Sequence, residues 1–142
     1  MLLLDTNVIS ELRKVHDGRT DPRFIAWAKA LDWSDLYLSV ITLYELELGV
    51  GRLEEYDTVQ GKILRTWLGE SVLKRFESRI LPVNEAIATR SAQLQIPRTR
   101  QVEDTLIAAT AYVHNLTVVT RNVDDFRDTG VRVINPWDKD SF

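Results

Sequence analysis

The 142-residue sequence contains no cysteine, which excludes disulfides, thiolate metal sites and a thiol nucleophile. No apolar stretch approaches the roughly 20 residues that a membrane-spanning helix needs. The N-terminus has no basic segment, and Asp5 interrupts its first apolar run, so we expect no signal peptide. These absences predict a soluble globular protein and fit a reducing cytoplasm, where we expect the protein to be found.

Several common catalytic arrangements are also missing. The only two histidines, His16 and His114, are far apart and lack metal-ligand spacing, and no Ser-His-Asp triad can be assembled. The Gly49–Gly51 stretch lies in or at the end of a predicted helix, so it is not a phosphate-binding loop. The net charge of −3 counts mildly against a general nucleic-acid binder. It does not exclude a nuclease, in which clustered acids lower the net charge.

The chain reads as one domain over residues 1–142, without repeats, linkers or low-complexity tracts. The predicted strands are Leu2–Asp5, Leu36–Val40, Arg79–Val83, Thr117–Thr120 and Val131–Ile134. The predicted helices are Thr6–Val15, Pro22–Leu31, Thr42–Leu53, Asp57–Ser78, Asn84–Gln95 and Val102–His114, with one further turn at Asn122–Arg127. This alternation predicts a three-layer α/β/α domain with a mostly parallel sheet.

Acidic residues recur where the predicted helices begin. Asp5 directly follows the first strand, and Glu45, Asp104 and the run 122–125 lie at comparable junctions or helix starts. Helix N-termini that follow parallel strands emerge at one edge of the sheet, so we expect these groups to converge. Converging carboxylates repel one another unless a cation neutralises them. An all-oxygen set favours Mg²⁺ or Mn²⁺ over zinc, and with it phosphodiester hydrolysis by activated water.

Helical geometry separates neighbouring acids. Glu45 and Glu47 differ by about 200° around a helix, and Glu45 is nearer the strand end, so we select Glu45. Glu103 and Asp104 are about 100° apart. Asp104 shares a face with small and apolar residues, which makes it the inward-pointing acid and Glu103 a residue of the rim.

Each acid has a simpler structural interpretation when taken alone. Asp and Asn favour helix N-caps, and acids favour the first turn. Asp5 and Asn122 could therefore be caps, and Asp104 could complement a helix dipole. The stretch Thr42–Glu45 matches the capping-box pattern. The ordered set of acids from separate segments is what favours a metal site over these alternatives.

The same residues make the chain resemble the PIN-domain ribonucleases, and within them the FitB- and VapC-type toxins of bacterial toxin–antitoxin pairs. The resemblance runs in order along nearly the whole chain. It rests on the segments Leu3–Glu11, Leu38–Thr42, Glu45-Leu46, Leu48–Val50, Arg79–Val83, Asp104–Ala111, Leu116–Asn122 and Asn135–Trp137.

The resemblance implies a Mg²⁺- or Mn²⁺-dependent endoribonuclease restrained by a cognate antitoxin. Asp5, Glu45 and Asp104 match the metal-binding core acids of the family. Thr6 and Thr120 match small hydroxyl positions near the site. One position departs from the pattern, because Asn122 stands where relatives often carry Asp. Either Asp124 or Asp125 would then supply the fourth carboxylate.

Basic and apolar residues suggest contacts with RNA and with proteins. Arg121 follows the fourth strand, and Arg98 and Arg100 precede Asp104, so all three are candidate RNA-phosphate contacts. A solvated polar loop is the alternative for Arg98 and Arg100. The apolar stripe from Val59 to Val72 exceeds what one helix needs for internal packing, which indicates a homodimer face or an antitoxin groove.

Two other functions remain open from the sequence. A phosphatase of the haloacid-dehalogenase type also begins with an Asp at a strand end. It needs a second Asp two residues on, where this chain has Asn7, and a lysine near the acids. The other alternative is a non-catalytic PIN-like scaffold that binds RNA or a partner, its metal site weakened by Asn122.

Overall fold

A single parallel sheet forms the centre of the protein, whose computed structural model describes residues 1–138. Its strands are β1 Leu2–Leu4, β2 Leu36–Ser39, β3 Ile80–Leu81, β4 Thr117–Val119 and β5 Val133–Ile134. They lie in the order β3-β2-β1-β4-β5, and every pairing is parallel. The mostly parallel sheet predicted from the sequence is thereby confirmed. Residues 139–142 of the predicted domain lie outside the described residues.

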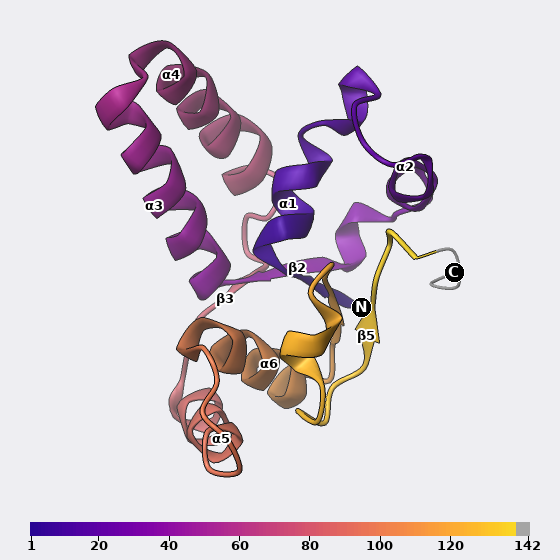
Figure 1. The fold of residues 1–142 in the computed structure, drawn as a ribbon, viewed down its shortest axis with the longest axis vertical. Coiled ribbons are helices and arrows are strands. Elements are labelled where there is room, and N and C mark those ends of the chain that lie inside the picture. Colours follow the sequence, from indigo (N-terminus) through magenta and orange to yellow (C-terminus); the bar gives the residue numbers. More distant parts are fainter. Residues whose placement is uncertain (139–142) are drawn as a thin grey trace.

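Helices cover both faces of this sheet (Figure 1). The α-helices are α1 Thr6–Leu12, α2 Pro22–Lys29, α3 Val40–Tyr56, α4 Thr58–Trp67, α5 Glu85–Leu94 and α6 Val102–His114. Short 3₁₀ segments are η1 Val15–Asp17, η2 Trp33–Asp35 and η4 Val123–Phe126, and η3 Leu68–Leu73 is a π-helix. Among the described residues, no helix is both long enough and apolar enough to cross a membrane.

The strands alternate their side chains between two apolar cores, as a buried parallel sheet requires. Leu4 and Val119 point into the core formed with α1 to α4. Leu3 and Val118 point into the opposite core, formed with α5, α6 and η4. All four side chains are fully buried. The three-layer α/β/α architecture is thereby confirmed.

Several predicted helix boundaries were wrong. Helix α2 ends at Lys29 rather than Leu31, and α3 ends at Tyr56 rather than Leu53. The first helix ends at Leu12 rather than Val15, where a 3₁₀ turn follows. Helix α3 begins at Val40, two residues early, because the Ser39 hydroxyl accepts the Ile41 N–H and caps it. The predicted helix 57–78 changes to a π-helix after Trp67 and ends at Leu73 rather than Ser78. Leu68 and Val72 of the π-helix are buried in the core.

Strand β1 lies in the middle of the sheet, with two strands on each side of it. The chain moves from β1 to β2 and β3 on one side, while β4 and β5 lie on the other. Beyond the carboxyl ends of β1 and β4, the chain therefore departs toward opposite faces, which creates a crevice. Asp5 and Thr120 are the first residues after these two strands, and the Asp5 N–H donates to Val119 O at 2.9 Å.

Candidate active site

Asp5 directly follows β1 at this edge of the sheet, and three donors hold its carboxylate. Its Oδ1 accepts the Thr6 N–H at 2.8 Å. Its Oδ2 accepts the Thr120 hydroxyl at 2.8 Å and the Asn7 amide at 3.1 Å. Only 6% of the residue is exposed. Asp5 therefore caps α1, as the simpler interpretation predicts, and also presents a buried carboxylate in a fixed orientation.

Thr6 connects Asp5 with Glu45. Its N–H donates to Asp5, while its hydroxyl donates to Glu45 Oε1 at 2.7 Å. The capping-box interpretation of Glu45 was wrong, because Ser39 is the N-cap and Thr42 is buried inside α3. Glu47 lies elsewhere and forms an ion pair with Arg65 at 2.5 Å. Geometry therefore places Glu45, and not Glu47, beside Asp5.

Asp104 and Asp125 complete the group of acids, and we call Asp5, Glu45, Asp104 and Asp125 the acid cluster. Asp104 lies in the first turn of α6, and Asp125 lies in η4. Burial, followed by the nearby charge of Asp125, raises the pKa of Asp104 to about 7. Asp5, Glu45 and Glu103 make smaller contributions to the same increase, so Glu103 also contributes to the field at this site.

The pKa values of Asp5 and Glu45 are raised as well. Burial raises the pKa of Asp5 against the opposing effect of its hydrogen bonds, and Asp125 adds to the increase. Burial also raises the pKa of Glu45, with further increases from Asp5 and Glu103. Within residues 1–138, no lysine or arginine forms an ion pair with the acid cluster. A bound proton or a cation from solution would therefore be needed to neutralise it.

The donor chemistry of the cluster suits a hydrated Mg²⁺ or Mn²⁺ ion. Every potential ligand is an oxygen, and Asp5 is already oriented by its neighbours. Among the described residues, no group of three or more acidic or histidine side chains is arranged to hold a metal ion. Mg²⁺ usually keeps several waters and binds one or two carboxylates directly, so the arrangement fits an ion that reaches the other acids through water.

Asn7 was not identified as a site residue from the sequence. The sequence shows only that Asn7 stands where a phosphatase would need a second Asp. Its amide nitrogen donates to Asp5 Oδ2 and, at 3.3 Å, to Thr120 Oγ1. Its amide oxygen accepts the Arg121 N–H at 3.0 Å. Asn7 thus connects the start of α1 to the segment after β4. An amide at position 7 is the one signal that the sequence offered.

The sequence left three candidates for the fourth acidic position, and the structure places them differently. Asn122 stands at the N-cap of η4, but its side chain makes no capping hydrogen bond; its N–H donates to Thr120 Oγ1 at 3.0 Å. Asp124 points away and pairs with Arg127 at 2.5 Å. Asp125 acts electrostatically on Asp5 and Asp104. The geometry thus favours Asp125 as the fourth acid.

The three candidate arginines lie in different settings. Arg121 is exposed, and its guanidinium lies 5.0 Å from the centre of the Trp137 ring. Arg98 is exposed and borders a hollow that Asp104 and Asp125 also line. The guanidinium of Arg100 is instead hydrogen bonded to the carbonyl oxygens of Asp125 and Arg127, at 3.4 and 2.8 Å.

The raised pKa of Asp104 leads to a prediction for the metal-free protein. The unfolded-state pKa is near 3.8 and the folded-state pKa is about 7, so the folded state holds the proton more tightly. The contribution of Asp104 to the free energy of unfolding should therefore fall as pH rises from about 4 to about 7, and stay low above that. Asp104→Asn removes this penalty. Solvent partly screens this half-buried carboxyl, so we expect the free energy of unfolding to increase by only roughly 1 kcal/mol at pH 8, or about 2–4 °C in Tm. At pH 4.5 we expect almost no increase.

The measurement is a series of thermal melts in EDTA between pH 4.5 and 8.5. Asp124→Asn serves as a matched control, since Asp124 is exposed and paired with Arg127. A gain for Asp104→Asn that is the same at every pH would contradict the assignment of the raised pKa to this carboxyl.

Comparisons with known proteins identify the family of the chain. The PIN domain family model matches residues 2–131. Toxin FitB of Neisseria gonorrhoeae is 42% identical, over 96% of this chain and 99% of the relative. VapC ribonuclease Y4jK of Sinorhizobium fredii is 36% identical, over 97% of this chain and 99% of the relative.

Solved structures show the same fold. The crystal structure of FitAcB from Neisseria gonorrhoeae superimposes with a TM-score of 0.86 at 40% identity, over 96% of this chain and 99% of that chain. A structure of FitAB bound to a DNA fragment gives a TM-score of 0.83 at 39% identity, over 97% of this chain and 96% of that one. The chain therefore belongs to the PIN domain family and, within it, to the toxins of the FitB and VapC type.

Proposed function

We propose that this protein is a Mg²⁺- or Mn²⁺-dependent endoribonuclease and the toxin of a toxin–antitoxin pair. The observation that carries the proposal is the acid cluster near the carboxyl ends of β1 and β4, whose carboxylates form no ion pair within residues 1–138. Relatives that are named ribonucleases support the reaction class. Asn7 hydrogen bonds to Asp5 instead of supplying a carboxylate, which counts against the phosphatase alternative.

The residues of the crevice have distinct tasks in this proposal. A bound Mg²⁺ or Mn²⁺ ion would lower the pKa of a coordinated water and offset charge on the scissile phosphate. Asp5 would anchor the ion, since three donors fix its carboxylate. Thr6 would hold Glu45 toward the same point. Asp104, with a pKa of about 7, would release its carboxyl proton when the cation arrives.

RNA would cross the site over Asp125. This residue lines two adjacent hollows, one bordered by Arg98 and Asp104, the other by Arg121 and Asn122. An arginine at each end of this path could hold a phosphate on either side of the acids. Thr120 would act indirectly, by fixing Asp5.

The direct test is incubation of the purified protein with single-stranded RNA in Mn²⁺ and in EDTA. Mn²⁺-dependent cleavage is the expected result. Hydrolysis of a small phosphate ester, but not of RNA, would favour the phosphatase alternative. Inactivity toward both, with partner binding retained, would favour the non-catalytic scaffold.

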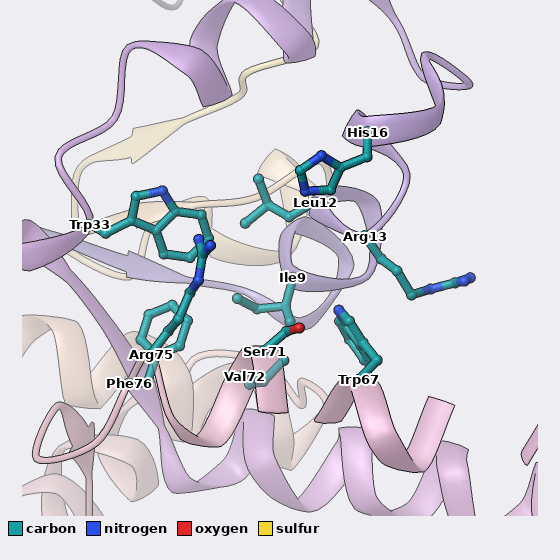
Figure 2. Close-up of a pocket in the computed structure, with 10 residues that line it drawn as sticks. All are labelled: Ile9, Leu12, Arg13, His16, Trp33, Trp67, Ser71, Val72, Arg75 and Phe76. Carbon is teal, nitrogen blue, oxygen red and sulfur yellow. The ribbon is translucent and has the colours of Figure 1, made fainter. Parts of the chain in front are cut away.

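The partner would dock at a cavity of about 130 Å³ on the α1–α4 face, which Figure 2 shows. Its wall combines apolar side chains such as Leu12 and Trp67 with basic groups from Arg13, His16 and Arg75. Such a lining suits an apolar side chain flanked by acidic residues. The solved structures of similar chains include toxin–antitoxin complexes, so we infer that an antitoxin segment occupies this cavity.

The predicted apolar stripe thus has two parts. Its second half, Leu68 and Val72, is buried in the core, and Val72 also lines the cavity. Its first half, Val59 and Ile63, is exposed, at 67% and 52%. This exposed half of α4 remains the candidate face for a homodimer or a second contact with the antitoxin.

Expression of the protein alone should arrest growth, and co-expression of the partner encoded beside it should restore growth. Ser71→Tyr places a bulky ring in the cavity of Figure 2 from an exposed position. We expect this variant to stay toxic but to lose at least part of its relief by the partner. The measurement is colony formation, with and without the partner.

Lys74→Tyr is the matched control, because the same side chain is added three residues away, outside the cavity wall. It should be relieved like the parent. Unimpaired growth at high soluble expression of the parent would contradict a toxin. Full relief of Ser71→Tyr would contradict docking at this cavity.

A further inference from the structure

Arg100 is fixed at both its backbone and its side chain. The Arg100 N–H donates to Gln95 Oε1 at 2.8 Å, and Gln95 Nε2 donates to Arg100 O at 3.1 Å. Gln95 Nε2 also donates to Thr105 Oγ1 at 3.1 Å, which in turn accepts the buried Ser91 hydroxyl at 2.9 Å. The loop before α6 is therefore anchored to α5 and to the first turn of α6, where Asp104 lies.

The guanidinium of Arg100 reaches from this loop to the segment that carries Asp125. It donates to the carbonyl oxygens of Asp125 and Arg127, at the C-terminal end of η4. Thr129 Oγ1 donates to the carbonyl oxygen between them, that of Phe126, at 2.6 Å. Three successive carbonyls are thus satisfied by side chains, and a cation suits this end of a helical turn.

The hydrogen bonds from Arg100 to η4 oppose the repulsion between the carboxylates of Asp104 and Asp125. The turn η4, which carries Asp125, lies beside α6 (Figure 1), and Asp125 and Asp104 line the same hollow. Without an opposing force, the two carboxylates would separate and move η4 away from α6. The Phe126 ring of the same turn is buried in the core formed with α5 and α6.

We propose that Arg100 is a positioning residue that holds Asp125 against Asp104, and so sets the spacing of the two acids that would share a cation. The metal-binding consequence rests on the proposed function; the connection to η4 does not. Arg100 is accordingly not one of the arginines that hold RNA phosphate. Its guanidinium is occupied by carbonyls, whereas the Arg98 side chain, two residues earlier, is exposed.

The test compares Arg100→Met, Arg100→Lys and the matched control Arg98→Met. The first measurement is amide hydrogen exchange at residues 124–129 in EDTA, which needs neither metal nor RNA. Exchange should be faster in Arg100→Met than in the parent, partly restored in Arg100→Lys, and unchanged in Arg98→Met. Lysine restores the charge but cannot bridge two carbonyls with one planar group.

The second measurement is calorimetric Mn²⁺ titration. We expect Arg100→Met to weaken binding by roughly tenfold, and Arg98→Met to change it by less than about twofold. In RNA cleavage, Arg100→Met should lower kcat at saturating RNA when Mn²⁺ is subsaturating, and added Mn²⁺ should restore it. Arg98→Met should instead raise KM for RNA.

The outcomes separate this inference from the proposed function. If Arg100→Met exchanges and titrates like the parent but raises KM, Arg100 is an RNA contact and the inference is overturned. If the parent itself binds no Mn²⁺, the proposed function fails, and the exchange data alone decide whether Arg100 holds η4. A thermal melt of each variant identifies any global loss of folding, in which case Arg100→Lys carries the test.

Discussion

Asp5→Asn should lose RNA cleavage by roughly 10²–10³-fold or more while the protein stays folded. Asparagine has nearly the same shape as aspartate but carries no charge, so the anchor for the cation disappears. Asp5 is the most deeply buried acid of the cluster, and its two oxygens are oriented by Thr6, Asn7 and Thr120. A fixed, buried charge of this kind contributes more to a metal site than a mobile one.

The stability of Asp5→Asn reflects two opposing effects. Removing a buried carboxylate relieves desolvation and the repulsion from Asp125, which together raise the pKa of Asp5. The new amide nitrogen faces the Asn7 amide nitrogen, however, and this contact between two donors costs about 1 kcal/mol. We therefore expect a Tm within about 3 °C of the parent in EDTA.

The measurement is Mn²⁺-dependent cleavage of RNA beside a thermal melt. Asp124→Asn makes the same chemical change at an exposed acid paired with Arg127, and should keep its activity. Asp104→Asn repeats the test from a different segment of the chain and should also be inactive. Full activity of a well-folded Asp5→Asn protein would rule out the metal-nuclease proposal.

Local patterns in the sequence were sufficient to predict the parallel sheet and the approach of the acids. Strand and helix order follow from apolar periodicity, and parallel strands place their carboxyl ends at one edge. The position of Asp5 after the first strand could be inferred in this way. The choice of Glu45 over Glu47 needed only the angle between successive residues of a helix, and the structure places Glu45 against Thr6.

Contacts between distant segments could not be predicted in the same way. The hydrogen bond from Thr6 to Glu45 spans 39 positions, and that from Asn7 to Thr120 spans 113. Each depends on how two elements are placed and on which rotamer a short side chain adopts, and neither leaves a periodic signal. For the same reason, Arg100 resembled a free cation in the sequence although its guanidinium is hydrogen bonded to η4.

The fourth acidic position gives the last prediction, a comparison of Asn122→Asp, Asp124→Ala and Asp125→Ala by calorimetric Mn²⁺ titration. Asp125→Ala should weaken binding by roughly tenfold, because Asp125 is the strongest charged influence on Asp104. Asp124→Ala should change the affinity little, since Asp124 is exposed and paired with Arg127. Asn122→Asp should also have little effect if Asp125 already supplies the fourth charge.

Two other outcomes would change this assignment. Tighter Mn²⁺ binding by Asn122→Asp, with no loss in Asp125→Ala, would place the fourth ligand position at residue 122 and make the parent a site with one charge fewer. An added carboxylate attracts the cation directly, so such a gain would be measurable. If all three variants titrate like the parent, residues 122–125 form only a helical turn, and the cation would be held by Asp5, Glu45 and Asp104 alone.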